Sequence, residues 1–350
     1  QYLLQQSQAV LWIMDQEINI ESSSVKLTWA NLNDQFSTFP STAPNISINS
    51  TAPCYLIYTS GTSGFPKGVL IAHQSFVNYL HWFTQTHQIT QQDRTVLFSS
   101  MAFDLGLTVL WSALTRGALL HLIDPEETWS FFESANEYLM NQQITYLKCT
   151  PAHFKLIVNA VDFQEWVDRH QLRLIFLGGE AIDAKDVQLY LKNREKTLIV
   201  NEYGPTEMTV GMVAKTIDAS NAFRFQQLPV IGQPVAGHEV YILDKDGRPL
   251  SIGEFGELYL VGPGKALGYI HQTDLTSQAF APLSILEGTQ TVAYASGDRG
   301  RWLPTGDIQL AGRMDQQVKI RGYRIELEEI NQQLKKLEGV QTAHTLVVAL

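Results

Sequence analysis

The chain has 350 residues, 45% of them hydrophobic, so it can bury a large core, and its length favours two or three packing units. Its formal net charge of −10, with acidic residues scattered along the sequence, argues against nucleic acid or an anionic membrane as a partner. No apolar run approaches the roughly 20 residues that span a bilayer. The two cysteines, Cys54 and Cys149, are expected as buried thiols in a reducing cytoplasm.

Between residue 54 and about residue 205, strand-like runs alternate with amphipathic segments of helical length. We expect strands at 54–59, 95–99, 118–123, 144–149, 172–177 and 197–201. We expect helices at 73–85, 104–116, 151–160 and 184–193. This alternation predicts a mostly parallel sheet with helices on both faces, in which ligands bind at the carboxyl ends of the strands.

Segment 58–69 combines glycines, hydroxyl residues and one lysine directly after the first expected strand. The glycines let backbone N–H groups approach a ligand, the hydroxyls add donors and Lys67 adds a charge, which together suit a polyphosphate. The spacing is not that of a P-loop, because Pro66 precedes the lysine and Gly68 follows it. A flexible surface loop is the alternative, but the position at a strand end favours the phosphate site.

Two further polar segments also follow expected strands. Gly178-Gly179-Glu180 comes after strand 172–177, and Tyr203-Gly204-Pro205-Thr206-Glu207 comes after strand 197–201. We therefore expect these segments and the glycine loop to share one rim.

Beyond about residue 225 the pattern changes to short strands and turns. Segments 239–243 and 256–261 predict a hairpin around Asp246-Gly247. A second hairpin is expected at 301–310, and a helix at 326–337.

Taken in order, these segments resemble the adenylate-forming enzymes, specifically the amino-acid adenylation domains of nonribosomal peptide synthetases. The resemblance is carried by 58–69, Asn201-Glu-Tyr-Gly-Pro-Thr-Glu207, 256–260, Tyr294-Ala-Ser-Gly-Asp298, Gly312-Arg-Met-Asp315 and 317–327. Their order and spacing agree across essentially the whole chain. The family's first motifs would lie before residue 1 and its last motif beyond Leu350.

The resemblance implies an α/β fold, with a large core of mostly parallel sheets covered by helices, a small β-barrel-like unit and a truncated α+β C-terminal lobe. Residues 1–224 would be the α/β part of the core that binds ATP and the amino acid. Residues 225–314 would be the β-rich part of the core, and 315–350 the start of the mobile C-terminal subdomain. Asp315 falls at the family's hinge. The family's catalytic lysine near the end of that subdomain would lie beyond Leu350.

The resemblance implies a reaction in two steps that takes place in the cytoplasm. ATP and a carboxylic acid give an acyl-adenylate and pyrophosphate, and the acyl group then passes to the phosphopantetheine thiol of a peptidyl carrier domain. A condensation domain would belong to the same assembly line. Attack of a carboxylate on the α-phosphate brings negative charges together, so positioned cations and donors must offset them.

The resemblance also implies residue roles. The β- and γ-phosphates would be held by Thr59, Ser60, Gly61, Thr62, Ser63, Gly64 and Lys67. The catalytic residues would be Lys67, Thr206, which donates to the α-phosphate, and Glu207, which holds Mg²⁺. The rest of the nucleotide would contact Gly178, Gly179, Glu180, Asn201, Tyr203, Gly204, Asp298 and Arg313. Tyr203 would stack on adenine, and Asp298 would accept the ribose hydroxyls. The structural alternatives are a turn aspartate for Asp298 and a helix N-terminal acid for Glu207.

Asp104 occupies the position where amino-acid-activating members keep an aspartate. A carboxylate there would bind the α-ammonium group and so distinguish an amino acid from a fatty or aryl acid. The alternative is that Asp104 caps the N-terminus of the following helix, and the two roles are compatible.

The positions expected to line the amino-acid pocket are Asp104, Leu105, Thr108, Lys148, Phe176, Gly178, Glu202, Val210 and Gly211. Lys148 and Glu202 are charged in an otherwise apolar lining, where a charge is costly unless it is paired or meets a ligand. They either pair with each other or bracket a side-chain amide, with Lys148 donating to its oxygen and Glu202 accepting from its NH₂ group. The second interpretation, and a resemblance to asparagine-activating domains, favour L-asparagine. Aspartate would be repelled by Glu202, and Phe176 would limit depth for glutamine.

Two rival interpretations remain. An acyl- or aryl-CoA synthetase of the same superfamily shares the ATP motifs but needs no acid at position 104. A catalytically incomplete core would bind the adenylate without releasing pyrophosphate. An NAD-binding Rossmann protein is disfavoured, because no Gly-x-Gly-x-x-Gly follows a strand.

Overall fold

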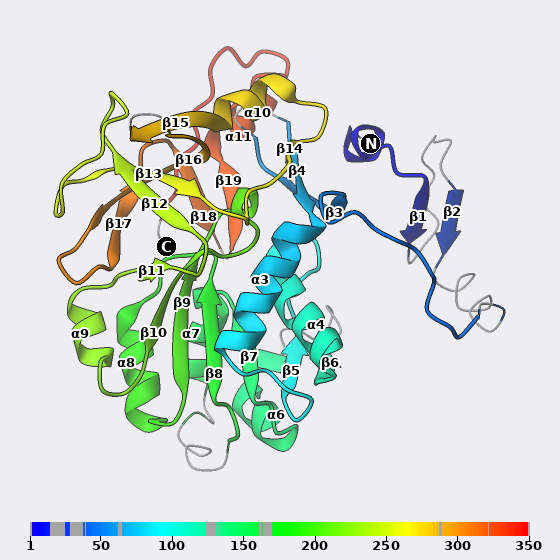
Figure 1. Cartoon of the computed structure of the whole chain (residues 1–350), viewed down its shortest axis with the longest axis vertical. Helices are drawn as coiled ribbons and strands as arrows, with labels where there is room; N and C mark the ends of the chain where they lie inside the picture. The colour runs from blue at the N-terminus through cyan, green and yellow to red at the C-terminus, as the bar shows by residue number, and fades with distance from the viewer. Residues whose placement is uncertain are drawn as a thin grey trace.

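The computed structural model of the chain describes residues 2–14, 25–28, 38, 40–61, 65–123, 131–132, 134–160, 163, 170–286, 289–320 and 322–348. A five-stranded sheet with the order β11-β10-β9-β8-β7 lies at the centre of the α/β part (Figure 1). Its strands are β7 (Tyr146–Cys149), β8 (Leu174–Gly178), β9 (Leu198–Tyr203), β10 (Val213–Ile217) and β11 (Gln233–Pro234). Strands β7, β8 and β9 are parallel, and β10 and β11 extend the sheet antiparallel.

The central strands are apolar because both faces of the sheet are covered. Every residue of β8 is buried, which explains its uninterrupted run Leu-Ile-Phe-Leu. Helices α7 (Pro151–Asn159) and α8 (Ala184–Asn193) lie between the parallel strands in the sequence. Strands β5 (Arg94–Leu97) and β6 (Leu119–Leu122) form a separate parallel pair. The helices that precede, connect and follow them in the sequence are α3 (His73–Thr86), α4 (Asp104–Arg116) and α6 (Ala135–Asn141). The expected strands and helices of this region are therefore confirmed, as is the α/β fold class.

The placement of the first expected strand in the parallel sheet is wrong. Strand β3 (Pro53–Thr59) pairs antiparallel with β4 (Lys67–Ala72), and β14 (Gly268–Tyr269) adds to β4. The glycine motif predicts Lys67 at the end of a loop, because the apolar run that follows it is short and begins inside that motif. Lys67 is instead the first residue of a buried strand, which fixes the position of its side chain.

The β-rich part forms a second five-stranded sheet. Its strands are β12 (Glu239–Leu243), β13 (Gly256–Val261), β15 (Phe280–Leu286), β16 (Thr289–Trp302) and β17 (Ile308–Arg313). Both expected hairpins are confirmed, since β12 pairs antiparallel with β13 and β16 with β17. In the sequence, helix α9 (Ala222–Gln227) precedes these strands and α10 (Thr273–Ala279) lies between β13 and β15. The strands β11 and β14 follow residue 224 yet join sheets of the α/β part, so the two parts of the core share sheets.

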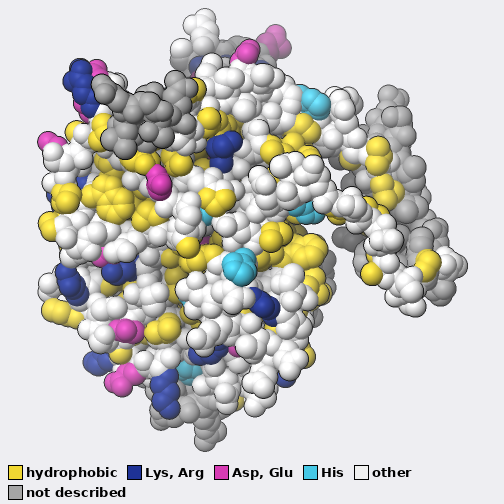
Figure 2. Space-filling model, in the orientation of Figure 1, with side chains coloured by type: hydrophobic (Ala, Val, Ile, Leu, Met, Phe, Trp, Pro, Cys, Tyr) yellow, Lys and Arg dark blue, Asp and Glu magenta, His cyan; other side chains and the backbone are white. Residues whose placement is uncertain are grey.

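The last described segment is a hairpin of β18 (Gln317–Ile320) and β19 (Tyr323–Glu326), followed by α11 (Leu327–Leu334). At the other end, α1 (Tyr2–Ser7) and the parallel pair β1 (Leu11–Met14) and β2 (Val25–Thr28) lie to one side of the molecule (Figure 1). Among the described residues, basic and acidic side chains are interspersed on the face drawn in Figure 2. None of the helices in the described ranges is long and apolar enough to cross a membrane.

His87 lies at the C-terminal end of α3 and tests how this helix packs against strand β8. Its ring lies 4.7 Å from that of Phe176 and 5.7 Å from that of Phe83. Burial, assisted by the charge of Arg173, lowers the pKa of His87 from 6.5 to about 4. The unfolded chain binds this proton near pH 6.5, whereas the folded chain does not, so His87 lowers stability progressively as the pH falls from 6.5 towards 4.

We expect this imidazole to account for a loss of up to about 3 kcal/mol across that window. Urea denaturation of the unsubstituted chain and of His87→Gln, compared across the same pH range, measures the effect. The variant should lose stability less steeply. Equal slopes for the two proteins would show that His87 is protonated as readily in the folded state.

Candidate active site

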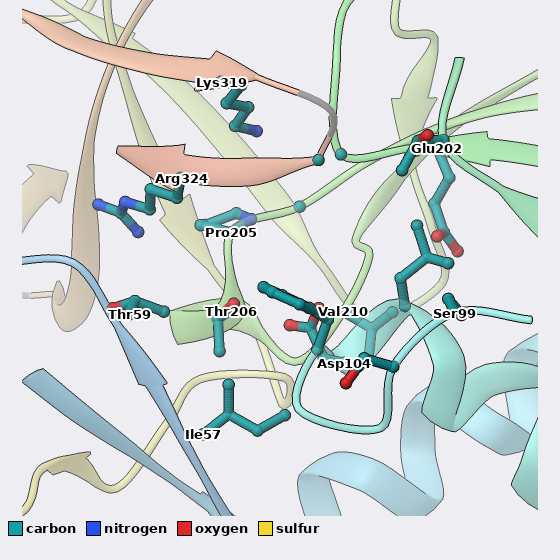
Figure 3. A pocket seen from close by; sticks show the side chains of 18 of the residues that line it. Ile57, Thr59, Ser99, Asp104, Glu202, Pro205, Thr206, Val210, Lys319 and Arg324 are labelled. Carbon is teal, nitrogen blue, oxygen red and sulfur yellow. The ribbon is translucent and has the colours of Figure 1, made fainter. Parts of the chain in front are cut away.

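A cavity of about 770 Å³ opens at the carboxyl ends of β8 and β9, beneath the C-terminal hairpin (Figure 3). The three segments expected to share a rim all line it, through Thr59 and Ser60 at the end of β3, Gly178 and Gly179 at the end of β8, and 204–206 after β9. The prediction of a common rim is confirmed, although β3 reaches it from a different sheet.

The predicted site residues divide into two groups. Those that line the cavity are Thr59, Ser60, Asp104, Leu105, Lys148, Gly178, Gly179, Glu202, Gly204, Thr206, Val210, Asp298 and Arg313. Those that are described but do not line it are Gly61, Lys67, Thr108, Phe176, Glu180, Asn201, Tyr203, Glu207, Gly211 and Asp315. Thr62, Ser63 and Gly64 lie outside the described residues. Several members of the second group contact a lining residue on the side that faces away from the cavity.

A buried network of four polar side chains lies at one end of the cavity, and two of them, Lys148 and Glu202, line it. Lys148 donates to Glu202, to the hydroxyl of Tyr79 at 2.9 Å and to the hydroxyl of Thr108 at 3.0 Å. Tyr79 in turn donates to Glu202 at 2.9 Å. The direct Lys148–Glu202 pair is the alternative that the sequence left open, and its two side chains are only 1% and 2% exposed.

Tyr79 belongs to the site although no sequence motif predicts it there. It lies on the buried face of α3, and a buried tyrosine hydroxyl needs a hydrogen-bond partner. That requirement was the available signal, since no other feature of α3 points to the cavity. Burial raises the pKa of Tyr79 well above its usual value, and the charge of Glu202 raises it further. Tyr79 therefore stays protonated and donates to Glu202.

The shape of this end of the cavity depends on a buried aromatic ring, a glycine and a strained valine. Phe176 is fully buried, stands opposite Lys148 in the β7–β8 ladder and packs on Phe83, with ring centroids 4.5 Å apart. Gly211 leaves room for Glu202, because a Cβ at position 211 would lie 2.4 Å from Cδ of that carboxylate. Val210 has a φ of 69°, a strained conformation for a β-branched residue and one that tends to occur at functional sites.

Asp104 is the first residue of α4 and faces the cavity beside Thr206 (Figure 3). The residue at the N-cap is Phe103, which makes no side-chain capping bond, so the interpretation of Asp104 as an N-cap is wrong. Burial raises the pKa of Asp104, while a hydrogen bond from Thr206 and the charge of Lys148 partly offset the rise. A cationic group in the cavity would stabilise this carboxylate.

Glu207 lies in η3 (Thr206–Met208) and is fully buried. Lys67 lies 3.0 Å from its Oε1, Tyr269 donates to the same oxygen at 2.8 Å, and Arg324 lies 2.9 Å from Oε2. Burial alone would raise the pKa of Glu207, but Arg324 and Lys67 outweigh it and hold the pKa far below its usual range. Glu207 is therefore ionised and already neutralised within the protein.

This arrangement does not fit the magnesium site expected at Glu207. Mg²⁺ takes one or two carboxylates together with waters and substrate phosphates. Both oxygens of Glu207 are occupied by protein cations, and the described ranges contain no group of three His, Cys, Asp or Glu residues able to hold a metal ion. With the hairpin docked, Glu207 is not available to a metal.

Asp298 lies in β16 opposite Arg313 in β17, and not in a turn. Its two oxygens are bound by the hydroxyl of Tyr203 at 2.5 Å and by Arg313 at 2.7 Å. Arg313 also donates to Asp315 through two nitrogens, both at 2.6 Å, and Asn201 donates to a backbone carbonyl at 2.8 Å. Each Asp298 oxygen accepts one of these hydrogen bonds and keeps a further lone pair, so both can also accept from a ligand hydroxyl.

The C-terminal hairpin supplies lining residues that have no predicted role in the site. Lys319 and Arg324 stand directly opposite each other in the β18–β19 ladder, and both line the cavity (Figure 3). Like charges in that position are unfavourable in a strand pair unless an anion compensates them. That juxtaposition was the signal for an anion site, but it becomes visible only when the register is known.

The cavity combines two cationic side chains, Lys319 and Arg324, with the carboxylate of Asp104. Comparison with known proteins specifies the class of protein. The chain belongs to the AMP-binding enzyme family, whose model matches residues 1–270. The motifs, the relatives and the structural neighbours identify it as an adenylation domain of the kind found in nonribosomal peptide synthetases.

Two curated relatives are bacterial synthases. The chain is 40% identical to bacitracin synthase 3 of Bacillus licheniformis over 303 residues, which are 86% of this chain and 5% of that protein. It is also 40% identical to surfactin synthase subunit 2 of Bacillus subtilis over 295 residues, 84% of this chain and 8% of that protein. The chain therefore spans less than a tenth of the length of these relatives.

Two solved structures share the fold. An artificially fused adenylation–PCP di-domain, NpsA-ThdA from Klebsiella oxytoca, gives a TM-score of 0.82 at 24% identity, covering 97% of this chain and 66% of that one. The nonribosomal peptide synthetase FmoA3 gives a TM-score of 0.78 at 26% identity, covering 89% of this chain and 33% of that one.

Proposed function

We propose that this chain activates an amino acid, L-asparagine, by forming aminoacyl-AMP from ATP with release of pyrophosphate. The aminoacyl group would then pass to the phosphopantetheine thiol of a peptidyl carrier domain, next to a condensation domain. Family membership supports the adenylating chemistry, and the adenylation–PCP pairing of one structural neighbour supports the carrier partner. The observation that best supports an amino acid as the substrate is the Asp104 carboxylate, which lies in the cavity beside Thr206.

Asparagine suits the Lys148–Glu202 end of the cavity because that end combines strong donors and acceptors with no net charge. A carboxamide is neutral and carries one acceptor and two donors. Its oxygen would replace Tyr79 or Thr108 as an acceptor for Lys148, and its NH₂ group would donate to Glu202. An aspartate side chain would face Glu202 and be repelled.

The triphosphate would lie against the hydroxyl and cationic side of the cavity. The Thr59 hydroxyl is buried with no hydrogen-bond partner in the described part of the chain, so it is free to donate to a ligand oxygen. Lys67 and Thr206 remain the proposed partners of the phosphates. ATP supplies the phosphoanhydride bond whose cleavage drives activation, and Asp104 and Thr206 would orient the amino acid beside it.

The proposal also divides the chain into three parts, with boundaries at residues 224 and 314, and places the hinge at Asp315. It further places the protein in the cytoplasm. The hinge position is supported by the place of Asp315, two residues before β18, where Arg313 binds its carboxylate. The cytoplasmic location is supported by Cys54 and Cys149, which are both free thiols.

Pyrophosphate release tests this function. We expect release that depends on ATP and asparagine, with aspartate and glutamine supporting at least about tenfold less, a difference of roughly 1.4 kcal/mol. Release driven by fatty or aryl acids with coenzyme A would favour the CoA-synthetase alternative. No release with any amino acid, despite binding of an adenylate, would leave an incomplete core.

A further inference from the structure

The hydrogen bonds at the Lys148 end of the cavity can be counted proton by proton. A lysine ammonium group has three N–H donors. Lys148 uses all three, on Glu202, on the hydroxyl of Tyr79 at 2.9 Å and on the hydroxyl of Thr108 at 3.0 Å. A further acceptor can therefore bind Lys148 only by displacing one of these partners.

The hydroxyl of Tyr79 is saturated as well. Its single proton goes to Glu202 at 2.9 Å, because an ionised carboxylate can only accept. The same hydroxyl lies 3.0 Å from that of Thr108, which must then be the donor in this pair. The two lone pairs of the Tyr79 oxygen are thus taken by Lys148 and Thr108. Tyr79 is only 3% exposed and lies behind the cavity lining, so a ligand meets its effect through Lys148 and Glu202.

The capacity that remains in this network is on the acceptor side. Glu202 accepts one bond from Tyr79 and one from Lys148, whereas a carboxylate has about four lone-pair sites. Glu202 and Lys148 both line the cavity. A ligand side chain there meets unused acceptor sites on Glu202 beside a lysine whose protons are all committed. This end of the cavity therefore suits an N–H donor, while an anionic group meets repulsion from Glu202 and no uncommitted proton on Lys148.

We propose that the hydroxyl of Tyr79 determines specificity in the amino-acid pocket. By holding one proton of Lys148 and giving its own to Glu202, it favours a substrate side chain that donates a hydrogen bond and disfavours an anionic one. Tyr79 is a positioning residue, since it acts through Lys148 and Glu202. The inference rests on the proposed function, because it takes this end of the cavity as the subsite for the amino-acid side chain.

The test compares the binding of nonhydrolysable asparaginyl-, aspartyl- and leucyl-adenylate analogues to the unsubstituted chain and to Tyr79→Phe by isothermal titration calorimetry. Removing the hydroxyl releases one N–H of Lys148, and a carboxylate gains more from that donor than a neutral carboxamide does. The ratio of the aspartyl to the asparaginyl dissociation constant should fall about tenfold, as expected for one added hydrogen bond between charged groups. Leucyl binding should change little, since its side chain makes no hydrogen bond.

Tyr146→Phe is the matched control. Tyr146 lies on the same strand as Lys148 and is fully buried. Its hydroxyl shares a hydrogen bond of 2.9 Å with that of Ser112, on the helix that carries Thr108. The variant therefore also loses a buried tyrosine hydroxyl, but one bonded outside the network around Lys148. It should leave the ratio of the two dissociation constants unchanged.

Thr108→Val tests the same idea without altering Tyr79. It also releases one N–H of Lys148, while the bond from Tyr79 to Glu202 stays. Its ratio should fall too, and it replaces Tyr79→Phe as the test if that variant does not fold. A ratio that does not fall in the folded variant, or an equal loss of affinity for all three analogues, would overturn the role of Tyr79 alone. If the unsubstituted chain bound none of the three, the proposed function itself would be wrong, and this inference with it.

Discussion

Replacing Lys148 by methionine is expected to lower the free energy of unfolding by about 3–5 kcal/mol. The substitution keeps the length of the side chain but leaves Glu202 buried with no cation beside it. Tyr79 would still donate to Glu202, and Thr108 would lose its contact with the ammonium group. Urea denaturation at neutral pH measures the loss.

The double variant Lys148→Met/Glu202→Leu separates the charge from the packing. A buried ion pair replaced by apolar residues of similar volume is often neutral or stabilising, so the double variant should recover most of the lost stability. It should nevertheless lose the preference for asparagine. Additive losses from the two substitutions would show that the pair is not the coupled unit that the structure describes.

Asp104→Asn is expected to lower kcat/KM for the amino acid by at least about 100-fold, because a charge-paired hydrogen bond to the substrate ammonium is worth roughly 2–5 kcal/mol. The substitution conserves shape. It should not lower stability, since burial raises the pKa of Asp104 and so opposes its ionised form. Amino-acid-dependent pyrophosphate release, combined with thermal unfolding, measures both effects.

Asp183→Asn provides the matched control for that experiment. Asp183 caps α8 by accepting a hydrogen bond from the backbone N–H of Lys185 at 2.9 Å, and it does not line the cavity. Its replacement should leave kcat/KM unchanged. If Asp104→Asn behaved the same way, the amine anchor would have to be another group.

The sequence was sufficient for the elements of the α/β part because their patterns are local. Strand β8 is a continuous apolar run, and α3 repeats its buried residues at helical spacing, so both were predicted close to their observed bounds. Strand β4 was missed because its first residue, Lys67, also belongs to the glycine motif. Pairing partners depend on the whole chain, which is why the antiparallel placement of β3 could not be predicted.

Site residues that belong to a motif could be predicted from the sequence. Contacts between side chains from distant segments could not. Asp104 and Thr206 were predicted independently and lie side by side. The choice between pairing and bracketing for Lys148 and Glu202 depended on whether β7 and β9 bring them within contact, which no local pattern records. Arg324 was missed for the same reason, because its partner Glu207 lies 117 residues away in the sequence.

The most direct test of the proposed activity is thermal stabilisation by nonhydrolysable aminoacyl-adenylate analogues, comparing asparaginyl with aspartyl, glutaminyl and leucyl forms. A ligand at about 100 times its dissociation constant adds roughly 2.7 kcal/mol to stability. We predict the largest shift for the asparaginyl analogue, and the smallest effect of Lys148 and Glu202 substitutions on the leucyl one. Equal shifts for all four would contradict the asparagine pocket, and no shift with any analogue would contradict the adenylate site itself.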